Sequence, residues 1–124
     1  MLVLTGCEKS GLLDYRNRFT GLYSCTTVEA VTHPTMNGAD TTETFLKREV
    51  IQVEKVIDTR DELFVLGTRI KINKDGKGTT NVNTGASYVH DTYTVDFSEQ
   101  TVTITRQKNG VNFGINATYV GVKI

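Results

Sequence analysis

Apolar and polar residues alternate one by one along most of this chain, which is the period of a half-buried β-strand. The alternation is clearest over residues 92–97, where Tyr, Val and Phe take every second position between Thr and Asp. Asn-Gly and Asp-Gly pairs, which favour tight hairpins, separate such runs at Asn37-Gly38, Asp75-Gly76 and Asn109-Gly110. The pattern predicts an all-β fold: an antiparallel meander that forms a small barrel or a sandwich.

The same pattern sets the expected elements. A short N-terminal helical turn is expected within residues 8–18. Strands are expected over residues 19–31, 43–57, 63–73, 88–97, 101–107 and 111–124. Residues 79–85 are polar and predict either a loop or a short edge strand. In the last strand the apolar phase changes after Tyr119 to Val120 and Val122, which predicts a bulge or a strand covered on both faces.

Residues 43–57 fit two periods. A helix is favoured by the spacing of Leu46, Val50, Val53 and Ile57, and a strand by Phe45, Ile51, Val53 and Ile57. We predict a strand, because the segments on both sides are strands.

The start of the chain carries a short motif. Leu4-Thr5-Gly6-Cys7 resembles the lipobox of bacterial lipoproteins. That resemblance implies that a diacylglyceryl group modifies the Cys7 thiol and that cleavage before Cys7 removes residues 1–6 as the remnant of a signal peptide. Residues 7–18 are then the lipidated Cys and its tether, and residues 19–124 form a single β domain. Two or three acyl chains anchor a protein stably.

A lipoprotein signal peptide carries a basic segment and an apolar stretch, whereas only six residues, none of them basic, precede Cys7. We therefore expect the signal peptide to begin upstream of this sequence; the alternative is a cytosolic protein with a disordered N-terminal tail. Lipidation of Cys7 leaves Cys25 as a small buried apolar residue. A Cys7–Cys25 disulfide and a catalytic thiol are the other two interpretations.

Three segments resemble small lipocalin-like bacterial lipoproteins. They are the opening Phe19-Thr20-Gly21-Leu22-Tyr23, the hairpin over residues 93–104 and the ending over residues 117–124. The resemblance implies an all-β fold and a bacterial cell envelope location, lipid-anchored to the outer membrane on its periplasmic or surface face. It implies no established activity, so no functional residues are transferred.

Fourteen basic and fourteen acidic residues balance to a net charge of zero in 124 residues. Nucleic-acid binders need a basic patch, so this balance argues against them. The expected partner is the membrane, through the anchor, and we expect a monomer.

Candidate chemistry is sparse. His90-Asp91 pairs an imidazole with a carboxylate, but neighbours on a strand point to opposite faces. His33 lacks further metal ligands. Asn73, Asp75 and Gly76 are better explained by a turn than by a calcium loop. Gly76, Gly78 and Gly85 lack the helix and Lys of a phosphate loop. We therefore predict no catalytic residues, no metal and no cofactor.

Binding is the remaining class of function. Five Tyr and five Phe are available to pack the core or to line a barrel mouth. We expect a non-enzymatic binding or accessory module. One alternative is a lipocalin-type carrier of a small apolar ligand, and the other is an envelope hydrolase or inhibitor.

Overall fold

The computed structural model describes residues 14–34, 38, 40–83, 90–110 and 113–124. A short 3₁₀ turn, η1 (Tyr15–Arg18), comes first and confirms the predicted helical turn. Eight strands follow it: β1 (Gly21–Pro34), β2 (Asp40–Lys55), β3 (Glu62–Val65), β4 (Thr68–Lys71), β5 (Lys77–Asn83), β6 (His90–Ser98), β7 (Thr101–Asn109) and β8 (Gly114–Lys123). Residues 43–57 therefore form mainly strand, as predicted, and residues 77–83 form the short strand β5.

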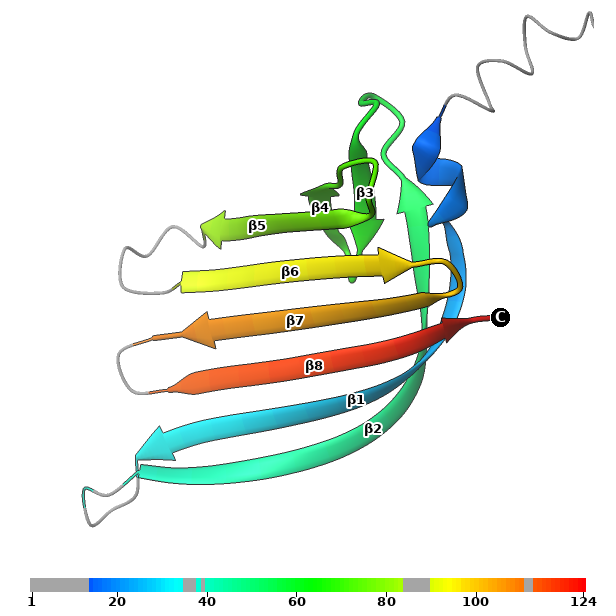
Figure 1. Cartoon of the computed structure of the whole chain (residues 1–124). Helices are drawn as coiled ribbons and strands as arrows, with labels where there is room; N and C mark the ends of the chain where they lie inside the picture. Colours follow the sequence, from blue (N-terminus) through cyan, green and yellow to red (C-terminus); the bar gives the residue numbers. More distant parts are fainter. Residues whose placement is uncertain (1–13, 35–37, 39, 84–89, 111–112) are drawn as a thin grey trace, which may run out of the picture.

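All paired strands are antiparallel and belong to one sheet with the order β4-β3-β2-β1-β8-β7-β6-β5. The first and last strands are neighbours, so the meander curls round on itself (Figure 1). The two ends of the sheet meet near a turn in which the Asn73 N–H donates to the Lys77 carbonyl at 2.9 Å. The all-β prediction is confirmed, and the sheet is a nearly closed barrel, compatible with a lipocalin-like fold.

The hydrophobic core occupies one end of this barrel, which we call the closed end. Its largest side chains with less than 2 % exposure include Tyr23, Leu63, Ile70, Ile72 and Ile104. Phe19 and Phe97 stack there with ring centroids 5.0 Å apart. These residues come from the start of β1, from β3 and β4, and from the ends of β6 and β7 that adjoin their hairpin, so the β-strands converge on a common apolar interior.

The Arg16 side chain is buried at this closed end of the barrel. Its Nη1 donates to the carbonyls of Val56 (3.1 Å) and Glu62 (2.9 Å), while Nε and Nη2 each lie 3.0 Å from the Asp14 carboxylate. Only 6 % of Arg16 is exposed. The turn η1 is thereby tied to the end of β2 and the start of β3.

The other half of the barrel is open on one side. β3 and β4 have four residues each, and β2 pairs with β3 only at Glu54 and Lys55. In Figure 1 the short β3–β4 hairpin stands at one end of the much longer β1 and β2. Residues 42–50 of β2 are exposed on both faces as a result. We call the inner face of this half of the sheet the open trough.

The prediction of one strand over residues 63–73 is wrong. Leu66 and Gly67 have φ angles of +53° and +75°, so the chain reverses there and forms the β3–β4 hairpin. Two consecutive left-handed residues are typical of a tight hairpin turn. A leucine is unusual in that conformation. Because Leu66 stands in a run of apolar residues, the sequence pattern did not predict a turn there.

The bulge predicted in the last strand is also wrong. β8 pairs with β1 and β7 in unbroken register, and its inner face continues through Ala117, Tyr119 and Gly121. Val120 and Val122 point outward and are 53 % and 56 % exposed. The alternation is hidden because glycine fills an inner position: a Cβ at Gly121 would lie 2.5 Å from the Cys25 sulfur.

Candidate functional site

The inner face of β7 changes character along its length. Val102 and Ile104 are fully buried in the core, and Arg106 and Lys108 take the next two positions on the same face. On β1 the inner face likewise passes from Cys25 to Thr27 and Glu29. Because successive inner positions lie two residues apart, the ionisable groups begin where the apolar core ends.

The Asp91–Arg106 ion pair is a two-hydrogen-bond contact on this face. Arg106 donates from Nε to Asp91 Oδ1 at 3.1 Å and from Nη2 to Oδ2 at 3.0 Å, a bidentate geometry. The Asp91 side chain is only 6 % exposed, and the Arg106 guanidinium lies 5.3 Å from the centre of the Tyr93 ring. The hydrogen bonds to Asp91 raise the pKa of Arg106. Among the residues that the structure describes, no acceptor takes the remaining Nη1 group.

Three more polar groups, Thr27, Glu49 and Tyr119, lie on the same inner face of the sheet. Thr27, itself 1 % exposed, donates from Oγ1 to Glu49 Oε2 at 3.2 Å. Burial and then the negative charge of Glu49 raise the pKa of Tyr119, whereas Arg106 acts on it in the opposite direction. Tyr119 lies directly opposite Thr27 on one side and Ile104 on the other. Glu49 and Arg106 therefore act on the pKa of the Tyr119 phenol in opposite directions.

Cys25 is a free, buried thiol at the inner end of the trough. Burial, followed by the charge of Glu49, raises the pKa of this thiol. A protonated thiol is a poor nucleophile. The structure thus confirms Cys25 as a small buried residue; Cys7 lies outside the described residues.

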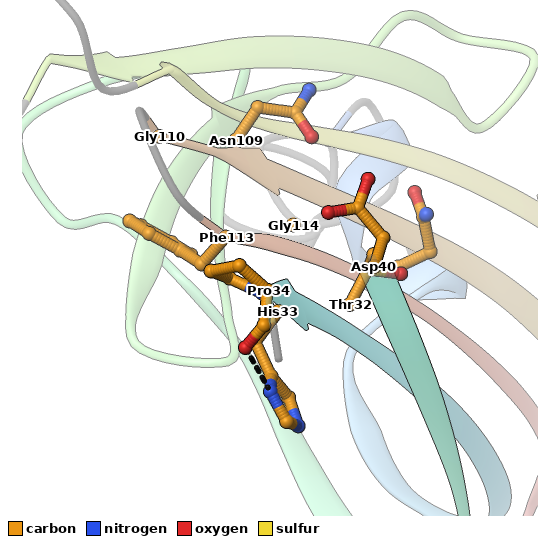
Figure 2. A pocket seen from close by; sticks show the side chains of 9 residues that line it. Thr32, His33, Pro34, Asp40, Asn109, Gly110, Phe113 and Gly114 are labelled. Carbon is orange, nitrogen blue, oxygen red and sulfur yellow. Dashed lines mark hydrogen bonds between the residues drawn. The ribbon is translucent and has the colours of Figure 1, made fainter. Parts of the chain in front are cut away.

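A hollow of about 370 Å³ opens where the end of β1 lies beside the β7–β8 hairpin (Figure 2). Its strand residues take outer positions, as Thr32 and Asn116 show, so it lies outside the trough. It is lined mainly by polar groups, among them Thr32, Asp40, Asn109 and Asn116, with Phe113 as its aromatic wall. His33 also lines it, with Nδ1 3.3 Å from its neighbour's carbonyl oxygen.

The remaining candidates from the sequence are dispersed. His90 is exposed at the start of β6, whereas Asp91 points inward to Arg106, so the two do not act together. Asn73 Oδ1 accepts the backbone N–H groups of Asp75 and Lys77, which confirms the turn. Gly85 and Tyr88 lie outside the described residues.

Within the described ranges, no group of three potential metal ligands is found. No helix in those ranges has the length and hydropathy needed to span a membrane.

Sequence reasoning missed Arg106, Lys108 and Glu49 as site residues. In the sequence each is a charged residue in an alternating strand, which is typical of a solvent-exposed face. Their position in the alternation could have identified them, because Arg106 and Lys108 fall on the same face of β7 as the apolar Val102 and Ile104. A charge in phase with a core face is expected to point into the barrel.

The fold and this face together define a small up-and-down β-barrel with a packed closed end and an open trough lined by ionisable residues. No protein-family model matches the chain, and comparisons with curated proteins and with solved structures find no significant similarity.

Proposed function

We propose that this protein is a non-enzymatic binding module of the bacterial cell envelope, anchored through a lipid on Cys7, and that its ligand binds in the open trough. The observation that carries the trough assignment is the Asp91–Arg106 pair. Burying an ion pair is costly, and it is tolerated where the groups are fixed for a purpose such as recognition. Asp91 holds the guanidinium in place and leaves Nη1 for a ligand oxygen.

The charges of the trough indicate the ligand's chemistry. On the inner positions of β1 and β2 the charges are Glu29, Glu43 and Glu49 against the single Lys47. The inner positions of β7 carry Arg106 and Lys108. The first side is therefore net acidic and the second basic. A small polar ligand that carries both an acidic and a basic group fits two walls of opposite sign. Tyr93 and Tyr119 add apolar area with a polar tip between them.

An apolar ligand inside the closed end is less compatible with the packing. Leu63, Val65, Ile70 and Ile72 are all 0 % exposed there, so an enclosed ligand would have to displace side chains. The ligand is therefore assigned to the open half.

The test uses the full chain isolated from the membrane fraction of the cells that produce it. Native and intact mass spectrometry of that sample is expected to show a mature chain that begins at an acylated Cys7 and retains a small-molecule adduct. Replacing the pair with neutral groups of similar shape, Asp91→Asn with Arg106→Gln, is expected to remove most of the adduct and to leave the acylation unchanged.

The matched control neutralises an exposed pair, Asp58→Asn with Arg69→Gln, whose ion pair spans 3.0 Å at the β3–β4 hairpin. Adduct loss in both double variants would contradict binding in the trough. A chain that starts unmodified at Met1 would contradict the anchor.

A further inference from the structure

The outer face of the barrel carries an extended surface of aliphatic and uncharged polar residues, with a single charge, over β2, β1, β8 and β7. We call it the outer patch and define it by its exposed aliphatic residues: Leu22, Val28, Leu46, Val50, Val120 and Val122. The strand registers make it continuous. Val50 lies opposite Ser24, which lies opposite Val122, and Leu46 lies opposite Val28 on the same face.

The patch contains one charged side chain. On its outer positions β2 has Arg48 between Leu46 and Val50, whereas the outer positions of β1 from Leu22 to Thr32 and of β7 from Thr101 to Gln107 are all uncharged. Leu46 is 71 % exposed and Val50 is 57 % exposed. Apolar patches of this kind on a soluble surface mark interaction sites.

We infer that the outer patch binds the same patch of a second copy of this chain and forms a two-fold dimer by sheet-on-sheet packing. The six aliphatic residues are 44–71 % exposed and together expose roughly 550 Å² per copy. Two copies then bury about 1,100 Å² of aliphatic surface, above the roughly 1,000 Å² in total that a specific interface needs.

The composition also favours a second copy as the occupant. In a two-fold interface each patch meets itself, so a face with many like charges repels its partner. Here Arg48 is the single charge, and it lies on β2, at the border of the patch. Valine and threonine on neighbouring strands interdigitate well between two packed sheets, and the Thr residues of β7 provide a polar rim.

A lipid surface fits this patch less well. Proteins that lie on membranes combine basic residues with Trp or Phe at the interface. Within the described part of the chain the outer patch offers neither an aromatic residue nor a basic cluster.

The test measures the mass of the full chain in solution by size-exclusion chromatography with light scattering. Every sample carries Cys7→Ser, so that no acyl chain contributes to association. The parent protein is expected at twice the 13.7 kDa of one chain. Val50→Lys with Val122→Lys is expected to raise the dissociation constant by at least ~100-fold, because two unpaired lysines enter the interface.

The control is Ile57→Lys, the same substitution at an aliphatic residue that is 98 % exposed but lies in the turn after β2. It is expected to remain dimeric, and circular dichroism checks that all variants keep their strands. A parent chain that stays at 13.7 kDa up to high micromolar concentration overturns the inference. So does a monomeric parent that sediments with phosphatidylethanolamine–phosphatidylglycerol vesicles through Val50 and Val122, since the patch would then be a membrane contact.

Discussion

Arg16 is a charged residue in a position that hydrophobic packing alone would assign to an apolar side chain. Its guanidinium is satisfied on every side by Asp14 and by the carbonyls of Val56 and Glu62. The hydrogen bonds from Arg16 hold the pKa of Asp14 at about 2, below its ordinary value of 3.8. The ionised carboxylate therefore stabilises the folded state.

Asp14→Asn is expected to lower the free energy of unfolding at neutral pH by about 2 kcal/mol, because it leaves the Arg16 charge without its partner. The lowered pKa of Asp14 also determines how this contribution to stability changes with pH. The contribution is complete above the unfolded pKa near 3.8 and is lost as the pH falls through about 2. Urea unfolding of both proteins from neutral to acidic pH measures the difference, which should shrink with acidification.

Asp58→Asn provides the control for this prediction. Asp58 pairs with Arg69, but its side chain is 73 % exposed. Its loss is expected to cost less than about 0.5 kcal/mol. Equal costs for the two substitutions would show that the Asp14–Arg16 contact has no special role.

Most single residues of the core could be predicted from their phase in the sequence, as Tyr93, Val95 and Phe97 show. The partner of Asp91 could not. Arg106 lies fifteen residues away, and only the β6–β7 register brings the two side chains together.

At the scale of elements, the contact between β1 and β8 depends on one missing side chain. Gly121 faces the Cys25 sulfur, and a Cβ there would also lie 3.2 Å from Val102 Cγ1. Both neighbours are buried, so neither has free space to move into.

Gly121→Ala is therefore expected to cost about 1–3 kcal/mol of unfolding free energy through overpacking, measured by urea denaturation. Cys25→Ala removes the sulfur that the new methyl group meets, so the double variant is expected to recover more than half of that loss. If the two substitutions simply added, the close approach of β1 and β8 would not be the cause.

The strands themselves were largely predictable because a half-buried sheet requires alternation. The β3–β4 hairpin was not, because Leu66 is apolar and packs against the core while its backbone is left-handed. The hydrophobic pattern does not indicate that Leu66 has a left-handed backbone, because this conformation is stabilised by its tertiary contacts with the core.

At the scale of the whole molecule, the two halves of the barrel differ in how many apolar side chains they bury. At the closed end β2 contributes Ile51 and Val53 to the core and pairs with β3 at Glu54 and Lys55. Along residues 42–50 the same strand is exposed on both faces and pairs with β1.

In the Val50→Lys, Val122→Lys variant, whose β2 is not covered by the proposed dimer, amide hydrogen exchange is expected to be at least ~10-fold faster over residues 42–50 than over residues 51–55. The first segment of the monomer lacks buried apolar contacts. Mass spectrometry of peptic peptides measures the exchange of both segments. Because both segments belong to β2, each serves as the reference for the other. Equal protection of the two segments in this variant would contradict the weaker stability of the open half. In the parent protein the difference is expected to be smaller, because the dimer covers Leu46 and Val50.

The expectation of a monomer belongs to this scale and stays untested. The alternation pattern does not describe how apolar residues are distributed on the surface of the folded barrel. Val120 and Val122 were expected to be covered or displaced by a bulge, and the register instead places them on the outer patch.

By itself the sequence determined the class of structure. Period-two alternation leaves few options other than strands, Asn-Gly and Asp-Gly pairs favour reversals, and the balanced charge argues against nucleic acid. Only the tertiary structure decided that the sheet closes into a barrel, that β3 and β4 are too short to wall the trough, and that Arg106 meets Asp91. The physical reason is that alternation distinguishes two faces of a strand, whereas the pairing of strands decides which face is covered and what lies across from it.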